Sequence, residues 1–134
     1  MQVLVARQDD KIPPAETGAS FYRIPTLQAS AQVLVVFDDI DSDFGVVKVK
    51  QKGGHGGHNG MRSILGRFSG DQGFPRVKIG IGRPPGQMQV ASYVLGRFRK
   101  EEVVTKDLAV REAVDAIESV CSLGLQLALS GKRV

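Results

Sequence analysis

The chain has 134 residues, of which 42% are hydrophobic and 24% charged, and its formal net charge is +4. Such a composition predicts one globular domain over residues 1–134, long enough to bury a core. No stretch approaches the roughly 18 apolar residues of a membrane span, and the start lacks the basic region of a signal peptide. The single cysteine excludes an internal disulfide and fits a reducing compartment.

The positive charge is concentrated in the middle of the chain. Residues 48–100 hold eleven basic residues and one acidic residue, which leaves seven basic and thirteen acidic residues for the two ends. A field polarised in this way favours a polyanionic partner, of which nucleic acid is the commonest. A solvated face on a basic protein is the plainer alternative.

The first half of the chain predicts two strands separated by a loop. Residues 2–6 are typical of a short buried strand, and residues 9–18 of a loop, with a turn of helix around 15–22. Residues 32–37 form a continuous β-branched run, which predicts a strand buried on both faces. Asp38 follows at the carboxyl end of that strand, where open α/β sheets place their ligands.

A glycine-rich loop follows the next predicted strand. Residues 46–50 alternate, so that Lys48 and Lys50 share one face of the strand. Residues 52–60 then hold five glycines and both histidines of the chain. Asn59 is a good N-cap for a helix over 61–68 that Gly70 ends, and the free N–H groups of that helix start would suit an anion.

The second half of the chain predicts a strand over 76–82, a loop over 83–86 and helical structure from residue 90 that is interrupted near Gly96. A long helix is expected over 101–129. Its predicted buried stripe consists of Val110, Val114, Ile117 and Cys121. Strands that alternate with helices favour an α/β domain of three layers.

The loop chemistry leaves more than one interpretation open. The two histidines, His55 and His58, would need a third ligand to bind zinc, and none lies near in the sequence. The Gly-Lys-Ser/Thr of a nucleotide-binding P-loop is absent. A histidine base held by a carboxylate, with Asp38 as the best candidate, would suit ester hydrolysis.

These residues closely resemble the bacterial-type peptidyl-tRNA hydrolases, most nearly their plant and organellar branch. The resemblance is strong over residues 21–98, looser over the C-terminal helix at 101–130, and weak over 1–20. It is carried by five segments: Phe-Tyr-Arg-Ile-Pro at 21–25, Val-Val-Phe-Asp-Asp-Ile-Asp at 35–41, Gly-Gly-His-Gly-Gly-His-Asn-Gly-Met-Arg-Ser-Ile at 53–64, Phe-Pro-Arg-Val-Lys-Ile-Gly-Ile-Gly-Arg-Pro at 74–84 and Tyr-Val-Leu-Gly-Arg-Phe at 93–98.

The resemblance implies an enzyme that cleaves the ester between a peptide and the 3′ end of tRNA, with no metal and no cofactor. It implies a three-layer α/β domain with a mixed, twisted sheet and a monomeric state. Asp38 matches the aspartate that orients the family's catalytic histidine, and Asn59 the asparagine that holds the substrate. Further residues are implied in binding peptidyl-tRNA: His55, Gly57, His58, Arg62, and Lys48, Lys50 and Lys78 on tRNA phosphates.

The sequence departs from the family at its start. The family opens with a strand, a Gly-Asn-Pro-Gly loop and a Thr-Arg-His-Asn segment that supplies the catalytic histidine, and none of these occurs here. We therefore expect an N-terminally truncated form of the fold with little or no turnover. The alternative is a non-catalytic RNA-binding protein, such as an organellar intron-splicing factor. The sequence does not choose between the cytoplasm and an organelle, chloroplast or mitochondrion.

Overall fold

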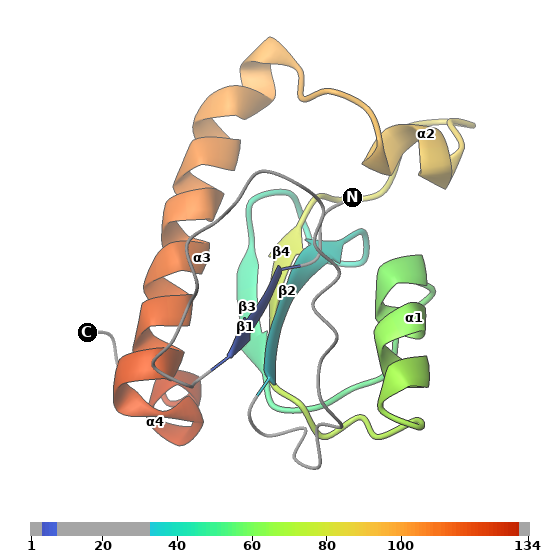
Figure 1. The fold of residues 1–134 in the computed structure, drawn as a ribbon. Coiled ribbons are helices and arrows are strands. Elements are labelled where there is room, and N and C mark those ends of the chain that lie inside the picture. Colours follow the sequence, from blue (N-terminus) through green and yellow to red (C-terminus); the bar gives the residue numbers. More distant parts are fainter. Residues whose placement is uncertain (1–3, 8–32, 132–134) are drawn as a thin grey trace, which may run out of the picture.

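The computed structural model describes residues 4–7 and 33–131. Four strands, four α-helices and one 3-10 turn lie in these residues (Figure 1). In chain order they are β1 (Leu4–Arg7), β2 (Val33–Asp39), β3 (Val47–Lys50), α1 (Asn59–Arg67), β4 (Arg76–Gly80), α2 (Val90–Val94), η2 (Lys100–Glu102), α3 (Val103–Leu123) and α4 (Leu125–Leu129).

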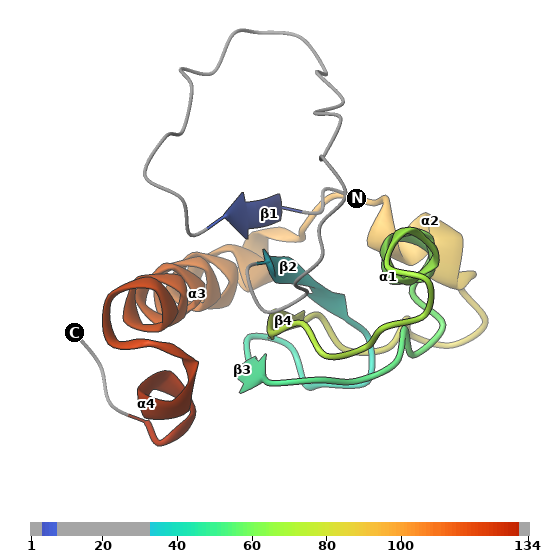
Figure 2. The same cartoon turned by 60° about the horizontal axis from the view of Figure 1, so that its bottom comes forward.

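The strands form one mixed sheet, as the resemblance implied. Their order is β1-β2-β4-β3, with β2 and β4 parallel in the centre and the two outer strands antiparallel to their neighbours. Helix α1 covers one face of this sheet, and α3 with α4 covers the other (Figures 1 and 2). The three layers of an α/β fold are therefore present in the described residues.

Strand β2 lies at the centre of the core and is buried on both faces, which confirms the prediction from its β-branched run. Val33, Val35 and Phe37 pack with Met61 and Leu65 of α1. The alternate residues face α3, because side chains of a strand point to opposite sides of the sheet. On that side the cluster contains Leu34, Val77, Ala113, Ala116 and Val120.

The buried stripe of the long helix is shifted by one position from the predicted one, of which Ile117 alone packs against the sheet-side cluster. Val110 and Val114 are 49% and 47% exposed, and Cys121 is also exposed, so the prediction of a buried cysteine was wrong. The residues that face the sheet are Ala109, Ala113, Ala116 and Val120. This stripe repeats the same spacing, and its small side chains let the helix backbone approach the sheet closely. Hydrophobicity alone favoured the valines, whereas close packing selects the alanines.

Several predicted boundaries also changed. The helix expected over 101–129 starts with the turn η2 and is broken at Gly124, whose φ of +84° separates α3 from α4. The strand expected over 2–6 is β1 at Leu4–Arg7, and the strand expected over 76–82 ends at Gly80. The helical turn expected around 15–22 lies outside the described residues. None of the helices within 4–7 and 33–131 is long and apolar enough to cross a membrane.

We predict that Gly80→Ala destabilises the fold while Gly66→Ala does not. A Cβ on Gly80 would lie 2.1 Å from the carbonyl oxygen of Asp43, whereas a Cβ on Gly66 in α1 meets nothing within 4 Å. Overpacking against backbone should lower the free energy of unfolding by about 1–3 kcal/mol at Gly80. The matched change at the exposed position of Gly66 in α1 should raise it by up to ~1 kcal/mol. Urea unfolding of both variants measures this, and equal stabilities would contradict the packing described.

Candidate functional site

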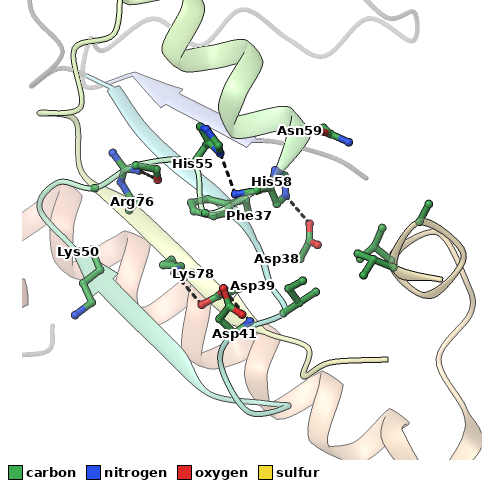
Figure 3. A pocket seen from close by; sticks show the side chains of 18 of the residues that line it. Phe37, Asp38, Asp39, Asp41, Lys50, His55, His58, Asn59, Arg76 and Lys78 are labelled. Atoms are coloured by element: carbon green, nitrogen blue, oxygen red, sulfur yellow. Dashed lines mark hydrogen bonds and ion pairs between the residues drawn. The ribbon is translucent and has the colours of Figure 1, made fainter. Parts of the chain in front are cut away.

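A pocket of about 710 Å³ lies at the carboxyl end of β2. Its walls are residues 37–41 at the end of that strand and residues 52–59, which we call the glycine loop. Side chains of β4 complete one side, and apolar residues of α2 close the other side (Figure 3). The end of strand β2, where we expected a ligand from the sequence, therefore borders a cavity.

His58 joins the end of β2 to the start of α1. Its Nε2 lies 3.0 Å from Oδ1 of Asp38, and its Nδ1 accepts a hydrogen bond from the backbone N–H of Met61 at 3.1 Å. Since a backbone N–H always donates, the neutral imidazole must carry its proton on Nε2 and donate it to Asp38. The imidazole also packs against the ring of Phe37 in a T-shaped arrangement, with the two centroids 5.1 Å apart.

The N-cap of α1 is therefore His58, and the prediction that Asn59 caps this helix was wrong. His58 has the extended backbone of a cap residue, whereas Asn59 is the first residue of the helix. Asn is the commoner cap, but the contact with Asp38 places the imidazole nitrogen where the cap acceptor is needed. The Asn59 side chain is exposed at the edge of the pocket and accepts a bond from Arg62 Nη1 at 3.3 Å.

His55 is held inside the glycine loop in a similar way. Its Nδ1 accepts the N–H of Gly57 at 2.9 Å, and its carbonyl accepts the N–H of His58, also at 2.9 Å. The turn between the two histidines needs glycine, because Gly56 and Gly57 have φ values of +56° and +80°. Both histidines thus use Nδ1 as an acceptor of a backbone N–H. Neither ring presents an unengaged lone pair to the pocket.

The predicted lysine positions fall into two groups. Lys48 and Lys50 on β3 are exposed, and neither takes part in an ion pair among the described residues. They lie across from Lys78 and Arg76 of β4, on the face of the sheet that α1 covers in part. Lys78, in contrast, forms an ion pair with Asp39 at 2.8 Å and is half-buried, so its charge is already balanced within the protein.

The acidic residues at the strand end are each engaged. Asp38 bonds to His58, and Asp41 forms an ion pair with Arg83. Burial by itself would raise the pKa of Asp39, but hydrogen bonds from Lys78, Ser42 and the Asp41 N–H and the charge of Lys78 outweigh it. The pKa of this carboxyl therefore lies below its usual value of 3.8.

No three His, Cys, Asp or Glu side chains of the described residues are grouped so as to hold a metal ion. The residue that sequence reasoning missed is Arg76, whose side chain is 2% exposed and lies against the glycine loop. In the alternating pattern of the strand, Arg76 and Lys78 occupy equivalent positions, so the sequence does not show which of them is buried. A buried guanidinium cannot be told from an exposed one without knowing which loops cross it.

Comparison with known proteins gives consistent matches. A family model described as "Peptidyl-tRNA hydrolase" matches residues 15–132. The chloroplastic peptidyl-tRNA hydrolase of Arabidopsis thaliana is 51% identical over 98 residues, which are 73% of this chain and 33% of that protein. The peptidyl-tRNA hydrolase of Chloroflexus aggregans is 43% identical over 104 residues, 78% of this chain and 55% of the relative.

A crystal structure of peptidyl-tRNA hydrolase from Acinetobacter baumannii is 33% identical and superposes with a TM-score of 0.54. The match covers 73% of this chain and 45% of the solved one. The chain thus spans about half the length, or less, of the relatives named here.

We predict that the Asp39–Lys78 pair makes the free energy of unfolding fall at acid pH. A carboxyl whose folded pKa is depressed contributes stability that is fully present above its unfolded pKa and is lost as the pH falls through the folded value. The contribution of Asp39 should therefore be complete at neutral pH and fade below about pH 3.8. Urea unfolding of Asp39→Asn against the parent chain at several pH values measures this.

The matched control for that series is Asp43→Asn, an exposed carboxylate in the same turn. It should change stability by less than about 0.5 kcal/mol at any pH. A destabilisation of Asp39→Asn that is the same at neutral and at acid pH would show that the ion pair is not its cause.

Proposed function

The chain belongs to the peptidyl-tRNA hydrolase family, and on that basis we propose that it acts on peptidyl-tRNA, as a hydrolase of the ester between peptide and tRNA. The observation that carries this proposal is the pairing of Asp38 with His58 beside Asn59 at the edge of one pocket. Three segments of the family pattern meet there: the end of β2, the glycine loop and the start of α1.

We assign roles to these residues as follows. Asp38 is the catalytic carboxylate, and Asn59 contacts the substrate near the scissile ester. His58, His55 and Gly57 hold the loop against the 3′ end of the tRNA. Basic side chains contact phosphates and provide affinity without reading bases, namely Lys48, Lys50, Arg62 and, with a smaller share because of its ion pair, Lys78.

The geometry places a limit on the hydrolysis step. Water must lose a proton to a general base before it attacks the ester. In residues 4–7 and 33–131, both histidines hold their Nδ1 lone pair in hydrogen bonds from backbone N–H groups, His55 from Gly57 in the loop and His58 from Met61 in α1. We therefore expect the 134-residue chain to bind tRNA but to turn over two to four orders of magnitude more slowly than an enzyme with a free base, which is the usual contribution of such a group.

Binding of RNA without hydrolysis is the second candidate, and the engaged histidine nitrogens favour it. The intron-splicing alternative has no support among the relatives reported above, all of which are described as peptidyl-tRNA hydrolases. The plant relatives are described as chloroplastic and, for a rice protein 44% identical, mitochondrial. These descriptions support an organelle as the place of action, and the cytoplasm stays the alternative. A monomeric state stays a prediction.

The Asp38→Asn variant tests the proposed reaction. An Asn oxygen can still accept the Nε2–H of His58, so the start of α1 should be preserved while the negative charge is lost. We expect this variant to abolish any release of N-acetyl-amino acid from N-acetyl-aminoacyl-tRNA and to leave tRNA affinity nearly unchanged. Equal turnover by variant and parent would exclude Asp38 from the catalytic role, and absence of tRNA binding by the parent chain would refute the proposed function itself.

The double change Lys48→Ala and Lys50→Ala tests the phosphate track. Each lost phosphate contact should reduce the slope of log affinity against log salt concentration by roughly 0.7–0.9, and two contacts by about 1.4–1.8. The matched control is Lys106→Ala on α3, a lysine that pairs with Asp107 outside the pocket. It should leave the slope unchanged, and an unchanged slope in the double variant would remove Lys48 and Lys50 from the tRNA contact.

A further inference from the structure

Arg76 is a buried cation with an unusual set of partners. Its side chain is 2% exposed, and its Nη1 donates to the carbonyl of Gly54 at 3.1 Å. Nη2 donates to the carbonyls of Gln72 at 3.1 Å and Phe74 at 3.3 Å. The guanidinium carbon lies 4.4 Å from the ring centroid of Phe74, which is itself fully buried. The group is thus held both at its edges and on one face.

These contacts join two loops that are distant in sequence. Gly54 belongs to the glycine loop, whereas Gln72 and Phe74 lie in the connection from α1 to β4. One backbone bond, from the N–H of Gly53 to Gln72 at 3.3 Å, runs beside the guanidinium. Because the Arg donors form a rigid planar fork, the carbonyls of the two loops are held at a set separation.

The glycine loop needs such a support more than most loops do. Gly53, Gly56 and Gly57 have positive φ values of +158°, +56° and +80°, and glycine loses more conformational freedom on folding than any other residue. At its exit the loop is held by His58 on Asp38. At its entry it is held by Arg76. In Figure 3, Arg76 and Asp38 lie on opposite sides of the labelled His55 and Phe37.

The charge of Arg76 adds a cost that the packing alone does not explain. No described carboxylate forms an ion pair with it, and its Nε–H is buried without a hydrogen-bond partner. Burial lowers the pKa of the guanidinium. Burying a charge without a counter-ion costs desolvation free energy. An apolar side chain of similar volume at this position would avoid that cost. The benefit of the arginine must therefore lie in the carbonyls that it holds.

We propose that Arg76 is a positioning residue of the site, which holds the entry of the glycine loop so that His58 and Asn59 stay at the edge of the pocket. It acts through the loop and need not touch the substrate. The inference deepens the proposed function, since the loop that it positions is the one assigned there to the 3′ end of the tRNA.

The test compares Arg76→Lys and Arg76→Met with Arg67→Met, an exposed arginine in the last turn of α1. Lysine keeps the charge but loses the fork, and methionine loses both. Three quantities are measured for each variant: amide hydrogen exchange of residues 53–58, affinity for a tRNA acceptor minihelix at two salt concentrations, and the thermal midpoint.

We expect both Arg76 variants to speed exchange in the loop by at least about tenfold and to weaken minihelix binding by a similar factor, since hydrogen bonds to a charged donor are lost. The lysine variant should keep the parent's salt slope. Arg67→Met should change affinity by less than about twofold, because an exposed charge at the far end of α1 is screened.

Several outcomes would overturn the proposal. Parent-like exchange and affinity in Arg76→Lys would show that charge alone suffices. A lower thermal midpoint with unchanged affinity and exchange would reduce Arg76 to a structural role, and lost affinity with unchanged exchange would indicate direct contact with the ligand.

Two further controls keep the test decisive. If the variants do not fold, the guanidinium protons of the parent chain can be observed by NMR, where a held group gives separate Nη1 and Nη2 signals and a free group gives one averaged signal. If the parent chain does not bind the minihelix, the proposed function fails, but loop exchange still tests Arg76 by itself.

Discussion

His58 makes two hydrogen bonds, and most of the site depends on them. One bond, from Nε2 to Asp38, joins the first helix of the described core to the central strand, and the other, from the Met61 N–H to Nδ1, completes the start of that helix. Because an imidazole has one donor and one acceptor when neutral, these two bonds use its whole capacity. The same arrangement that orders the glycine loop and places Asn59 at the pocket edge thus removes His58 as a base for water.

The charges around the pocket are divided by the same geometry. The carboxylates at the end of β2 are each engaged, Asp38 by His58, Asp39 by Lys78 and Asp41 by Arg83. Lys48 and Lys50 on the outer strand have no such partners among the described residues. The unbalanced positive charge therefore lies along β3, where an anionic ligand would meet it first. This division agrees with a protein that binds a polyanion beside a site for polar chemistry.

The parts of the fold that follow from local patterns could be predicted from sequence, and those that depend on packing could not. The β-branched run of β2 and the alternation of β3 indicated their strands and faces correctly. In α3, hydrophobicity pointed to Val110 and Val114, but the sheet selected the neighbouring stripe of alanines, because close approach outweighed the burial of larger side chains. In the site, residue preference favoured Asn59 as the cap, while a contact twenty residues away, Asp38, made it His58. Arg76 depended in the same way on a loop crossing that no sequence window contains.

The central role of His58 is tested most directly by determining which ring nitrogen carries its proton. Long-range ¹⁵N–¹H correlation spectra of the imidazole rings, recorded on the 134-residue chain at neutral pH, distinguish a proton on Nε2 from one on Nδ1. We expect His58 to carry its proton on Nε2, with Nδ1 unprotonated and bonded to the Met61 amide. A ring protonated on Nδ1 would contradict this expectation, since the helix would then lack its cap and Nε2 would be free to act as a base.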